Sequence, residues 1–243
     1  MISVSHITKY HQRQCVLDDV SLVVKEGTQL CLVGPGGAGK TLLLKIITGL
    51  VDPDDGDVTV NGQDMLALNE IELASARNRM GMLFQNYALF DFMNVEENIA
   101  FPLRQRNELK DEEIREKVAD LLQKVDLPGI QEKFPNELSG GMKKRVTFAR
   151  AVIHDPPILF YDDPTAGLDP VTSGKIFNLL KKRREEKGTT SIVITHDILG
   201  VRDICDEFAL MNHGRLVFRG TRDEIEASSD RFVQQFWRGE SDE

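Results

Sequence analysis

A glycine-rich loop, residues 34–41, has the residue types and spacing of a phosphate-binding site. Its sequence, Gly34-Pro35-Gly36-Gly37-Ala38-Gly39-Lys40-Thr41, fits the pattern G-x-x-x-x-G-K-[ST] and lies between an apolar strand-like run and an apolar helical stretch. The glycines let the backbone approach an anion closely, so that N–H groups and the helix N-terminus face the phosphates. Lys40 can reach the β- and γ-phosphates, and the Thr41 hydroxyl can bind Mg²⁺. The loop therefore predicts a nucleoside triphosphate site.

A dinucleotide-binding fingerprint is an alternative interpretation of the same loop. Gly34-x-Gly36-x-x-Gly39 fits it, and Asp54 lies about 20 residues further on, where a ribose-binding acid would fall. However, residues 52–57 read as a turn and not as the end of a second strand, and a nicotinamide site has no use for Lys40. A calcium loop in this acidic segment is disfavoured because Asp57 stands where an EF-hand needs glycine. We therefore favour the triphosphate interpretation.

Two acids, Asp162 and Asp163, end an apolar run that begins at Ile158. An aspartate in this position can hold Mg²⁺ opposite the phosphate loop, and the next acid can polarise an attacking water. The common alternative is a solvated aspartate at the end of a strand. The phosphate loop earlier in the chain favours the metal-binding and catalytic interpretation.

A second pair of glycines lies in Leu138-Ser139-Gly140-Gly141-Met142. One interpretation is a turn in which Ser139 is the N-cap of the following helix. Alternatively, the adjacent glycines free backbone N–H groups to approach an anion, which would make a second phosphate-binding surface. Because one chain rarely needs two such surfaces for one nucleotide, the second suggests a site that is completed across a dimer.

Composition disfavours several other classes of protein. The 243 residues are 41% hydrophobic and 28% charged, and the formal net charge of −9 argues against a broad basic surface for nucleic acid. No apolar run reaches the roughly 18 residues that span a bilayer, and residues 1–10 lack the apolar middle of a signal peptide. Cys15, Cys31 and Cys205 have no paired spacing, which disfavours a disulfide framework or a zinc site. We expect a soluble, cytoplasmic protein.

The elements that position these residues follow the pattern of a mostly parallel sheet covered by helices. Strands are predicted at Val16–Val24, Leu30–Val33, Val58–Val60, Met80–Phe84, Pro157–Tyr161, Thr190–Thr195 and Glu207–Met211. Residues 95–153 have helical periodicity, and a helix is expected to start at Asp111 because acids fill its first turn. We predict a single α/β domain over residues 1–243, with a core at 1–90 and 155–243 and an inserted helical subdomain at about 91–154.

Together the motifs resemble the ATP-binding cassette (ABC) ATPases, and the match covers essentially the whole chain in the right order. The resemblance implies an ABC ATPase fold, in which a P-loop NTPase (RecA-like) core carries N-terminal antiparallel β elements, and it implies ATP and Mg²⁺ as ligands. Residues 34–41 then match Walker A, Asp162 matches the Walker B aspartate, and Leu138–Gly141 match the signature motif that engages the ATP of the opposite subunit. Further roles follow from the resemblance: adenine stacking for Tyr10, Mg²⁺ sensing and permease contact for Gln85, the D-loop for Asp169, and the γ-phosphate switch for His196.

A narrower resemblance is to the ATPases of MCE-associated phospholipid transporters of the Mla (maintenance of lipid asymmetry) type. It rests on Phe84-Gln85, Ala88-Leu89-Phe90, Phe101–Arg104, Met142 and the tail Phe232–Trp237. It implies a Mla-type permease, an MCE-domain lipid carrier and a small STAS-domain subunit as partners. The signature motif of the wider family implies a homodimer closed around two ATP molecules, and the acidic charge balance predicts no nucleic-acid partner. The protein would lie on the cytoplasmic face of the inner membrane, held there by the permease. The C-terminal segment, residues 228–243, would form a helix that packs on its own core or binds a partner.

Three residues depart from the family pattern. Gly36 replaces a serine common in Walker A, Met142 replaces a glutamine of the signature motif, and Asp163 replaces the catalytic glutamate. Aspartate is shorter by one C–C bond, about 1.5 Å, and a misplacement of about 1 Å can cost roughly 100-fold in rate. The resemblance implies the ATP-binding and hydrolysing motor subunit of an ABC transporter that moves phospholipid between the membranes of a bacterial envelope. Two alternatives stay open: a non-transport ABC ATPase that acts as an assembly or nucleic-acid factor, and a slow ATP-gated dimerisation switch.

Overall fold

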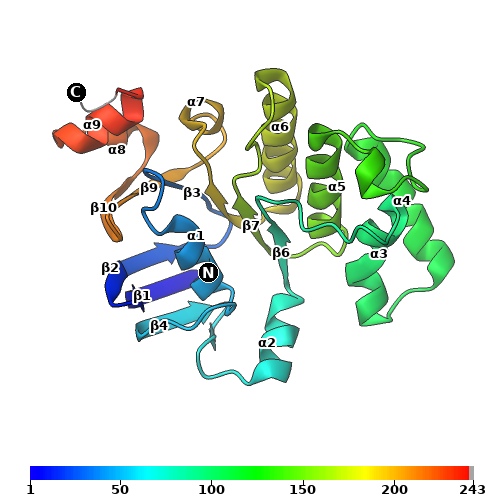
Figure 1. Cartoon of the computed structure of the whole chain (residues 1–243), viewed down its shortest axis with the longest axis horizontal. Coiled ribbons are helices and arrows are strands. Elements are labelled where there is room, and N and C mark those ends of the chain that lie inside the picture. Colours follow the sequence, from blue (N-terminus) through cyan, green and yellow to red (C-terminus); the bar gives the residue numbers. More distant parts are fainter. Residues whose placement is uncertain (241–243) are drawn as a thin grey trace.

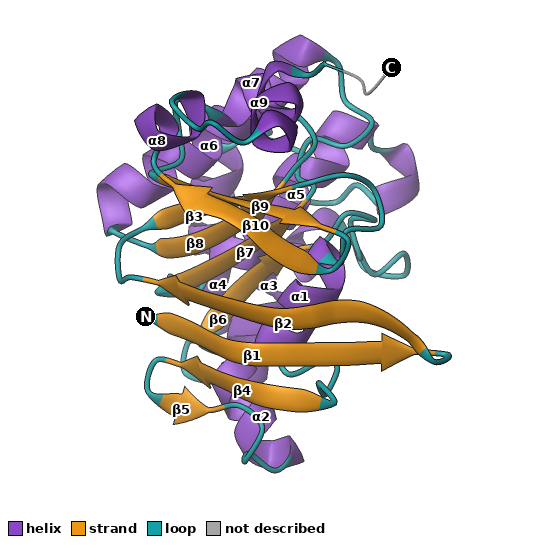
Figure 2. Ribbon diagram, turned by 90° about the vertical axis from the view of Figure 1, so that its left-hand side faces the viewer, coloured by secondary structure: helices purple, strands orange, loops and turns teal. Residues whose placement is uncertain are grey.

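Two β-sheets organise the chain in the computed structural model, which describes residues 1–240. The larger sheet has the strand order β10-β9-β3-β8-β7-β6, and the smaller sheet has the order β2-β1-β4-β5. Helices α5 and α6 cover one face of the larger sheet, and α1 lies between the two sheets (Figure 1 and Figure 2). The molecule is therefore layered, with helices on both faces of its larger sheet.

The larger sheet is mostly parallel, as the sequence predicts. It consists of β3 (Gln29–Val33), β6 (Met80–Leu83), β7 (Ile158–Asp162), β8 (Thr190–Ile194), β9 (Glu207–Asn212) and β10 (Arg215–Gly220). All of its pairs are parallel except that of β10 with β9. The smaller sheet is antiparallel and consists of β1 (Ile2–His11), β2 (Gln14–Val24), β4 (Asp55–Val60) and β5 (Gln63–Asp64). The α/β class is thus confirmed.

The helices lie between the strands in the sequence, and the last two follow the last strand. They are α1 (Lys40–Ile47), α2 (Glu70–Arg77), α3 (Val95–Arg106), α4 (Asp111–Lys124), the 3-10 helix η1 (Pro135–Glu137), α5 (Gly140–Val152), α6 (Pro170–Lys187), α7 (Ile198–Val201), α8 (Arg222–Glu226) and α9 (Arg231–Arg238). Residues 95–153 contain no strand, and α4 begins at Asp111, so both expectations for this region are confirmed. The boundaries of a separate helical subdomain stay a prediction.

The central strands of the larger sheet are buried on both faces. Every residue of β3, β7 and β8 is buried, as expected for parallel strands covered by other elements. Leu30 and Leu32 pack in the core shared with α1 and the smaller sheet, whereas Cys31 and Val33 pack in the core that contains α5 and α6. A slip of one residue would exchange these two sets, so the double burial fixes the register. The strand ends therefore hold their loops in defined positions.

Three strands, β1, β10 and the two-residue β5, are missing from the set expected from the sequence. In β1, polar residues alternate with the buried Ile2, Val4 and Ile7, and a positive φ of 53° at His6 interrupts the alternation. None of the residues of β10, at the edge of its sheet, is fully buried. The expected turn at residues 52–57 is wrong in its second half, because β4 begins at Asp55 and pairs with β1.

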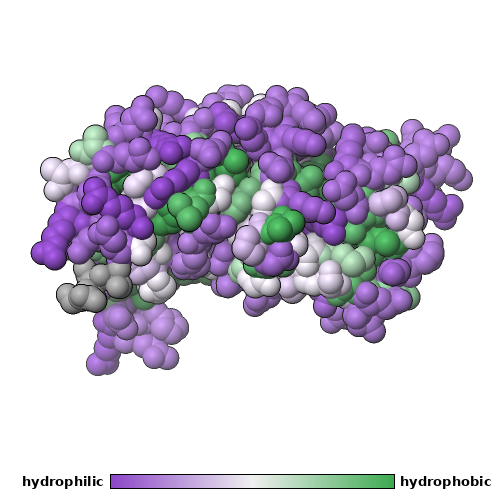
Figure 3. All heavy atoms as spheres, turned by 90° about the horizontal axis from the view of Figure 1, so that it is seen from above, coloured by the Kyte–Doolittle hydropathy of each residue, from purple (hydrophilic) through white to green (hydrophobic). Residues whose placement is uncertain are grey.

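The C-terminal segment contains the expected helix, α9. Val233 and Trp237 of α9 are buried, and the Trp237 ring meets Phe208 of β9 edge-on with centroids 4.9 Å apart. Residues 241–243 of the predicted tail lie outside the described residues. On the face seen in Figure 3 the surface is mostly hydrophilic, and apolar residues gather in separate patches. Within residues 1–240, no helix has both the length and the apolar character needed to cross a membrane.

Candidate active site

A cavity of about 280 Å³ lies where the loops after β3, β6, β7 and β8 meet. Ligands of open parallel sheets bind outside the carboxyl ends of the strands, and this cavity has that location. Its lining includes Gly36–Thr41, Gln85, Asp162, Asp163 and His196. The structure therefore brings together most of the residues that the sequence singles out, although they come from four separate loops.

Glycine is required at two positions of the loop between β3 and α1. Gly34 has a φ of 147°, and a Cβ there would lie 2.2 Å from the carbonyl oxygen of Met211. Gly39, the N-cap of α1, has a φ of 97°, and a Cβ there would lie 2.6 Å from the Leu17 side chain. At Gly36, in contrast, a Cβ would meet nothing within 4 Å. The wrapped shape of the loop thus depends on Gly34 and Gly39 and not on Gly36.

Lys40 folds back over the same loop. Its Nζ donates hydrogen bonds of 2.8 Å to the carbonyl oxygens of Gly34 and Pro35. Burial lowers the pKa of Lys40, and the carboxylates of Asp163 and Asp162 oppose this effect. The ammonium group is thus held at the cavity by neutral carbonyls, which phosphate oxygens can replace as stronger, charged partners.

Thr41 and Asp162 place two oxygen atoms at one side of the cavity. The Thr41 hydroxyl donates to Asp162 Oδ1 over 3.1 Å. Burial raises the pKa of Asp162, and the hydrogen bond from Thr41 opposes this effect. Hydroxyl and carboxylate oxygens are ligands that suit Mg²⁺, which commonly takes its remaining ligands from substrate phosphates and water.

Asp163 has an uncommon backbone conformation, with a φ of 47°. Its N–H donates to the carbonyl oxygen of Ile194 over 2.9 Å. Its side chain is only 11% exposed, and its Oδ2 lies 4.0 Å from His196 Nε2. Burial raises the pKa of Asp163, opposed in turn by His196, Lys144 and Lys40. A strained, desolvated carboxylate at a cavity has the features of a group that positions or deprotonates water.

Lys144 of α5 is a residue that the sequence analysis misses. It is fully buried, and its Nζ donates to the carbonyl oxygens of Gln85 (2.8 Å) and Asp163 (3.0 Å). The signal that could have identified it is the spacing of Lys144, Thr147 and Arg150, three polar residues on one face of a largely buried helix.

Other residues singled out in the sequence lie away from this cavity. Tyr10 pairs with Cys15 near the end of β1 and is 53% exposed, while Val16 of β2 lines the cavity instead. The contact of Tyr10 with adenine stays a prediction.

Ser139, Gly140, Gly141 and Asp169 also lie outside the lining of this cavity. Ser139 is the N-cap of α5 and accepts a hydrogen bond of 3.3 Å from Met142 N, so the capping interpretation holds. Asp169 is the N-cap of α6 and accepts from the N–H groups of Val171 and Thr172, each at 3.0 Å. A second phosphate-binding surface at the start of α5 stays a prediction.

Comparison with known sequences places the chain among transport ATPases. Residues 17–166 match the family model described as "ABC transporter". The "Intermembrane phospholipid transport system ATP-binding protein MlaF" of Haemophilus influenzae is 39% identical over 242 residues, which cover 100% of this chain and 92% of the relative. The protein of the same name from Escherichia coli strain K12 is 36% identical over 229 residues, 94% of this chain and 85% of the relative. The "Probable ribonucleotide transport ATP-binding protein mkl" of Mycobacterium leprae is 37% identical over 238 residues, 98% and 69%.

Comparison with solved structures also finds an ATP-binding cassette. The dimeric structure of a post-hydrolysis state of the ATP-binding cassette MJ0796, bound to ADP and Pi, superimposes with a TM-score of 0.86 at 33% sequence identity. The match covers 91% of this chain and 99% of that chain. The similarity therefore extends over about nine tenths of the chain.

Proposed function

This chain belongs to the ABC transporter family and has the fold of its ATP-binding cassettes, and on that premise we propose that it is the ATP-hydrolysing motor subunit of a transporter. The observation that carries the proposal is the convergence of residues 36–41, Gln85, Asp162, Asp163 and His196 on one cavity. Phosphoryl transfer requires mainly positioning and charge stabilisation, and these residues supply a phosphate cradle, a cation, a metal ligand and a carboxylate for water.

The polar residues that line the cavity have separate roles in this proposal. The loop at 34–41 wraps the phosphates, and Lys40 exchanges its carbonyl partners for β- and γ-phosphate oxygens. Asp163 orients the attacking water, and His196 holds the γ-phosphate. Lys40 and the loop N–H groups stabilise the charge that develops on the transferring phosphoryl group.

Thr41 and Asp162 would hold Mg²⁺, with Gln85 as the third protein contact. The donor types fit, and the 3.1 Å hydrogen bond already brings the two oxygens to one side of the cavity. When bound, the ion neutralises charge on the phosphate oxygens. It also lowers the cost of keeping the buried Asp162 ionised.

We further propose that the site is completed by a second copy of the chain. Ser139, Gly140 and Gly141 start α5, whose N-terminal N–H groups favour an anion, yet they do not line the cavity of their own chain. In a head-to-tail dimer they would contact the γ-phosphate held by the opposite copy, with Asp169 at the same interface and Tyr10 against the adenine. The dimeric state of the MJ0796 cassette supports this arrangement.

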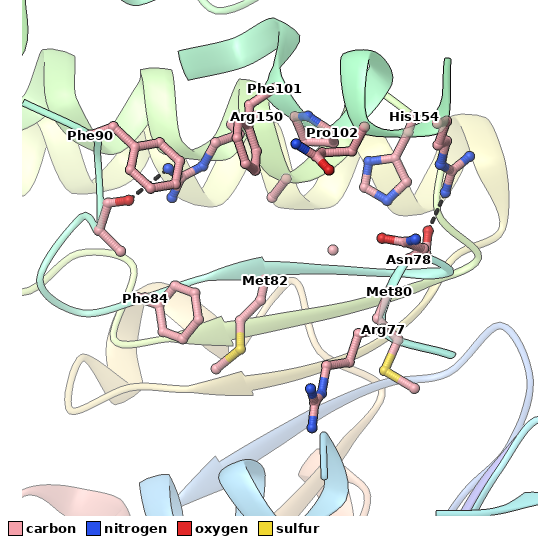
Figure 4. Close-up of a pocket in the computed structure, with 15 residues that line it drawn as sticks. Arg77, Asn78, Met80, Met82, Phe84, Phe90, Phe101, Pro102, Arg150 and His154 are labelled. Carbon is pink, nitrogen blue, oxygen red and sulfur yellow. Dashed lines mark hydrogen bonds between the residues drawn. The ribbon is translucent and has the colours of Figure 1, made fainter. Parts of the chain in front are cut away.

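A groove of about 410 Å³ beside β6 is the proposed docking site for a Mla-type permease. Figure 4 shows Phe90, Phe101 and Pro102 on one side of it and Phe84 and Met82 on the other. Phe84 lines the groove and the next residue, Gln85, lines the nucleotide cavity. A permease segment in the groove would therefore sit next to the loop that contacts the nucleotide.

The proposed cargo is phospholipid, moved between the membranes of a bacterial envelope. It rests on the names of the MlaF relatives. The MCE-domain carrier, the STAS-domain subunit and a place on the cytoplasmic face of the inner membrane are proposed on the resemblance of the motifs to Mla-type ATPases alone. The mkl relative is named for ribonucleotide transport, so the two cargoes should be compared directly. Reconstituted with its permease in vesicles, the chain should drive ATP-dependent movement of labelled phospholipid and not of labelled ribonucleotide. The opposite preference would refute the lipid assignment.

Replacement of Lys40 tests the motor assignment. Lys40→Ala should abolish tight ATP binding or turnover, because the cavity loses the cation that faces the phosphates. Lys25→Ala, which removes an exposed cation just after β2, is the matched control and should retain both. Full ATPase activity of Lys40→Ala would exclude the assignment.

A further inference from the structure

One buried lysine holds together the loop after β6 and the loop after β7. The Nζ of Lys144 donates to the carbonyl oxygen of Gln85 at 2.8 Å and to that of Asp163 at 3.0 Å. It also lies 5.1 Å from the centre of the Tyr87 ring. The side chain is fully buried, so these carbonyls and the ring replace the water that would otherwise surround the ammonium group.

Both loops have backbone conformations that need support. Asp163, Tyr87 and Ala88 have φ values of 47°, 59° and 50°. Residues other than glycine persist in this region only where their surroundings hold them there. The surroundings here are one face of α5, because Thr147 Oγ1 donates to Tyr87 O at 3.2 Å and Arg150 Nη1 donates to Ala88 O at 2.6 Å.

With the role of Asp163 in the proposed function as its basis, we propose that Lys144 is a positioning residue for ATP hydrolysis. It fixes the peptide of Asp163, and hence the place of the carboxylate, relative to the loop that carries Gln85. The contact of Lys144 with this peptide matters because the side chain of aspartate is short. With few torsions available, the carboxylate reaches the water only if the backbone is held correctly.

Filling the space in α5 would not by itself require a lysine, because an apolar side chain of similar volume would do so. Such a side chain would leave the two loop carbonyl oxygens without their donor, so the lysine is required for holding the two loops. The same face of α5 also reaches the proposed permease groove, which Ala88 and Arg150 line. Helix α5 therefore contacts both the groove and the peptide of Asp163, and Lys144 makes the contact with Asp163.

The test measures kcat, KM and the stoichiometry of ATP binding of the purified full chain with MgATP. Lys144→Met should lower kcat by at least about 10-fold, with KM within about 2-fold and full ATP stoichiometry, because only the placement of the carboxylate is lost. Lys144→Arg keeps the charge and the donors and should recover most of kcat. Lys117→Met removes an exposed lysine of α4 and should match the wild type.

Two results would overturn the proposal. One is a wild-type kcat in Lys144→Met. The other is a parallel fall of kcat and ATP stoichiometry, which would mean that Lys144 only maintains the fold. If Lys144→Met does not fold, Lys144→Arg, which keeps the donors, and Lys144→Ala, which has none, decide, since equal kcat values in these two would also overturn it. Asp163→Asn separates this proposal from the proposed role of Asp163. ATP turnover by Asp163→Asn would refute the role of Asp163 itself. No turnover by Asp163→Asn, together with full turnover by Lys144→Met, would refute only the positioning role of Lys144.

Discussion

The hydroxyl of Thr41 donates a hydrogen bond of 3.1 Å to Asp162 Oδ1, and so joins two loops whose residues are 121 positions apart in the sequence. The bond links the start of α1 to the end of β7. It places the phosphate loop and the acid pair in a fixed relation before any nucleotide binds. The oxygens that make this bond are the same ones proposed to hold Mg²⁺.

Removal of the Thr41 hydroxyl should therefore affect the metal-dependent part of ATP binding. Thr41→Val keeps the shape of the side chain but not its oxygen, and we expect MgATP affinity to fall by about 10-fold while binding of ATP in EDTA stays unchanged. Titration calorimetry under both conditions measures the difference. Thr48→Val is the control, because that hydroxyl bonds to Leu44 O within α1. Equal losses with and without Mg²⁺ would contradict the metal assignment.

Replacement by alanine should lower the stability of the protein at one glycine of the same loop and leave it unchanged at another. Gly34→Ala puts a Cβ 2.2 Å from a backbone oxygen of Met211 at a φ of 147°, so it should destabilise the protein by at least about 2 kcal/mol. Gly36→Ala has open space and should leave stability within about 0.5 kcal/mol. Urea unfolding of both variants checks this. A stable Gly34→Ala protein would show that the loop can relax.

The sequence indicated many of the residues that line this cavity because their patterns are local. A phosphate loop, an acid pair and a histidine after a strand each carry their geometry within a few residues, and parallel strands bring their carboxyl ends to one edge. The ends of the buried strands β3, β7 and β8 were predicted to within two residues, because an apolar run is also a local pattern.

Long-range packing explains what the sequence did not show. The contact of Lys144 with Gln85 spans 59 residues and depends on how α5 lies against two loops, which no local pattern encodes. Strand β1 was missed because the bulge at His6 interrupts the alternation on which strand prediction relies. The role of Ser139–Gly141 also depends on a second chain.

His154, which lines the groove beside β6, should make the fold sensitive to acid. Burial, and secondly the Arg106 guanidinium, lower the pKa of His154 from 6.5 to about 4. The folded state therefore keeps His154 neutral while the unfolded chain protonates it, so its contribution to stability is complete above pH 6.5 and is lost as the pH falls from 6.5 towards 4. With a discount for its partial exposure, this loss should be on the order of 1–2 kcal/mol.

Replacement of His154 should remove this acid sensitivity. Unfolding free energies at pH 7.5 and about pH 5 should differ less in His154→Leu than in the wild type. His11→Leu, at an exposed position, should not change the difference. An unchanged pH dependence in His154→Leu would show that other groups cause it.

Association of two chains should depend on the charge at position 139. In an Asp163→Asn background, which should retain ATP, MgATP should produce a dimer in sedimentation experiments. Ser139→Asp keeps an N-cap for α5 but adds a negative charge towards the γ-phosphate, so it should prevent the dimer, whereas Ser139→Asn, a neutral cap, should permit it. Dimers of equal stability in both would place the signature segment away from the nucleotide.

The proposed role of Asp163 in hydrolysis is tested most directly by steady-state ATP turnover. The wild type, Asp163→Asn and Asp163→Glu are each measured alone and with the permease. We expect turnover by the wild type that Asp163→Asn abolishes. Absence of wild-type turnover even with the permease, together with turnover in Asp163→Glu, would contradict it and show instead an ATP-gated switch.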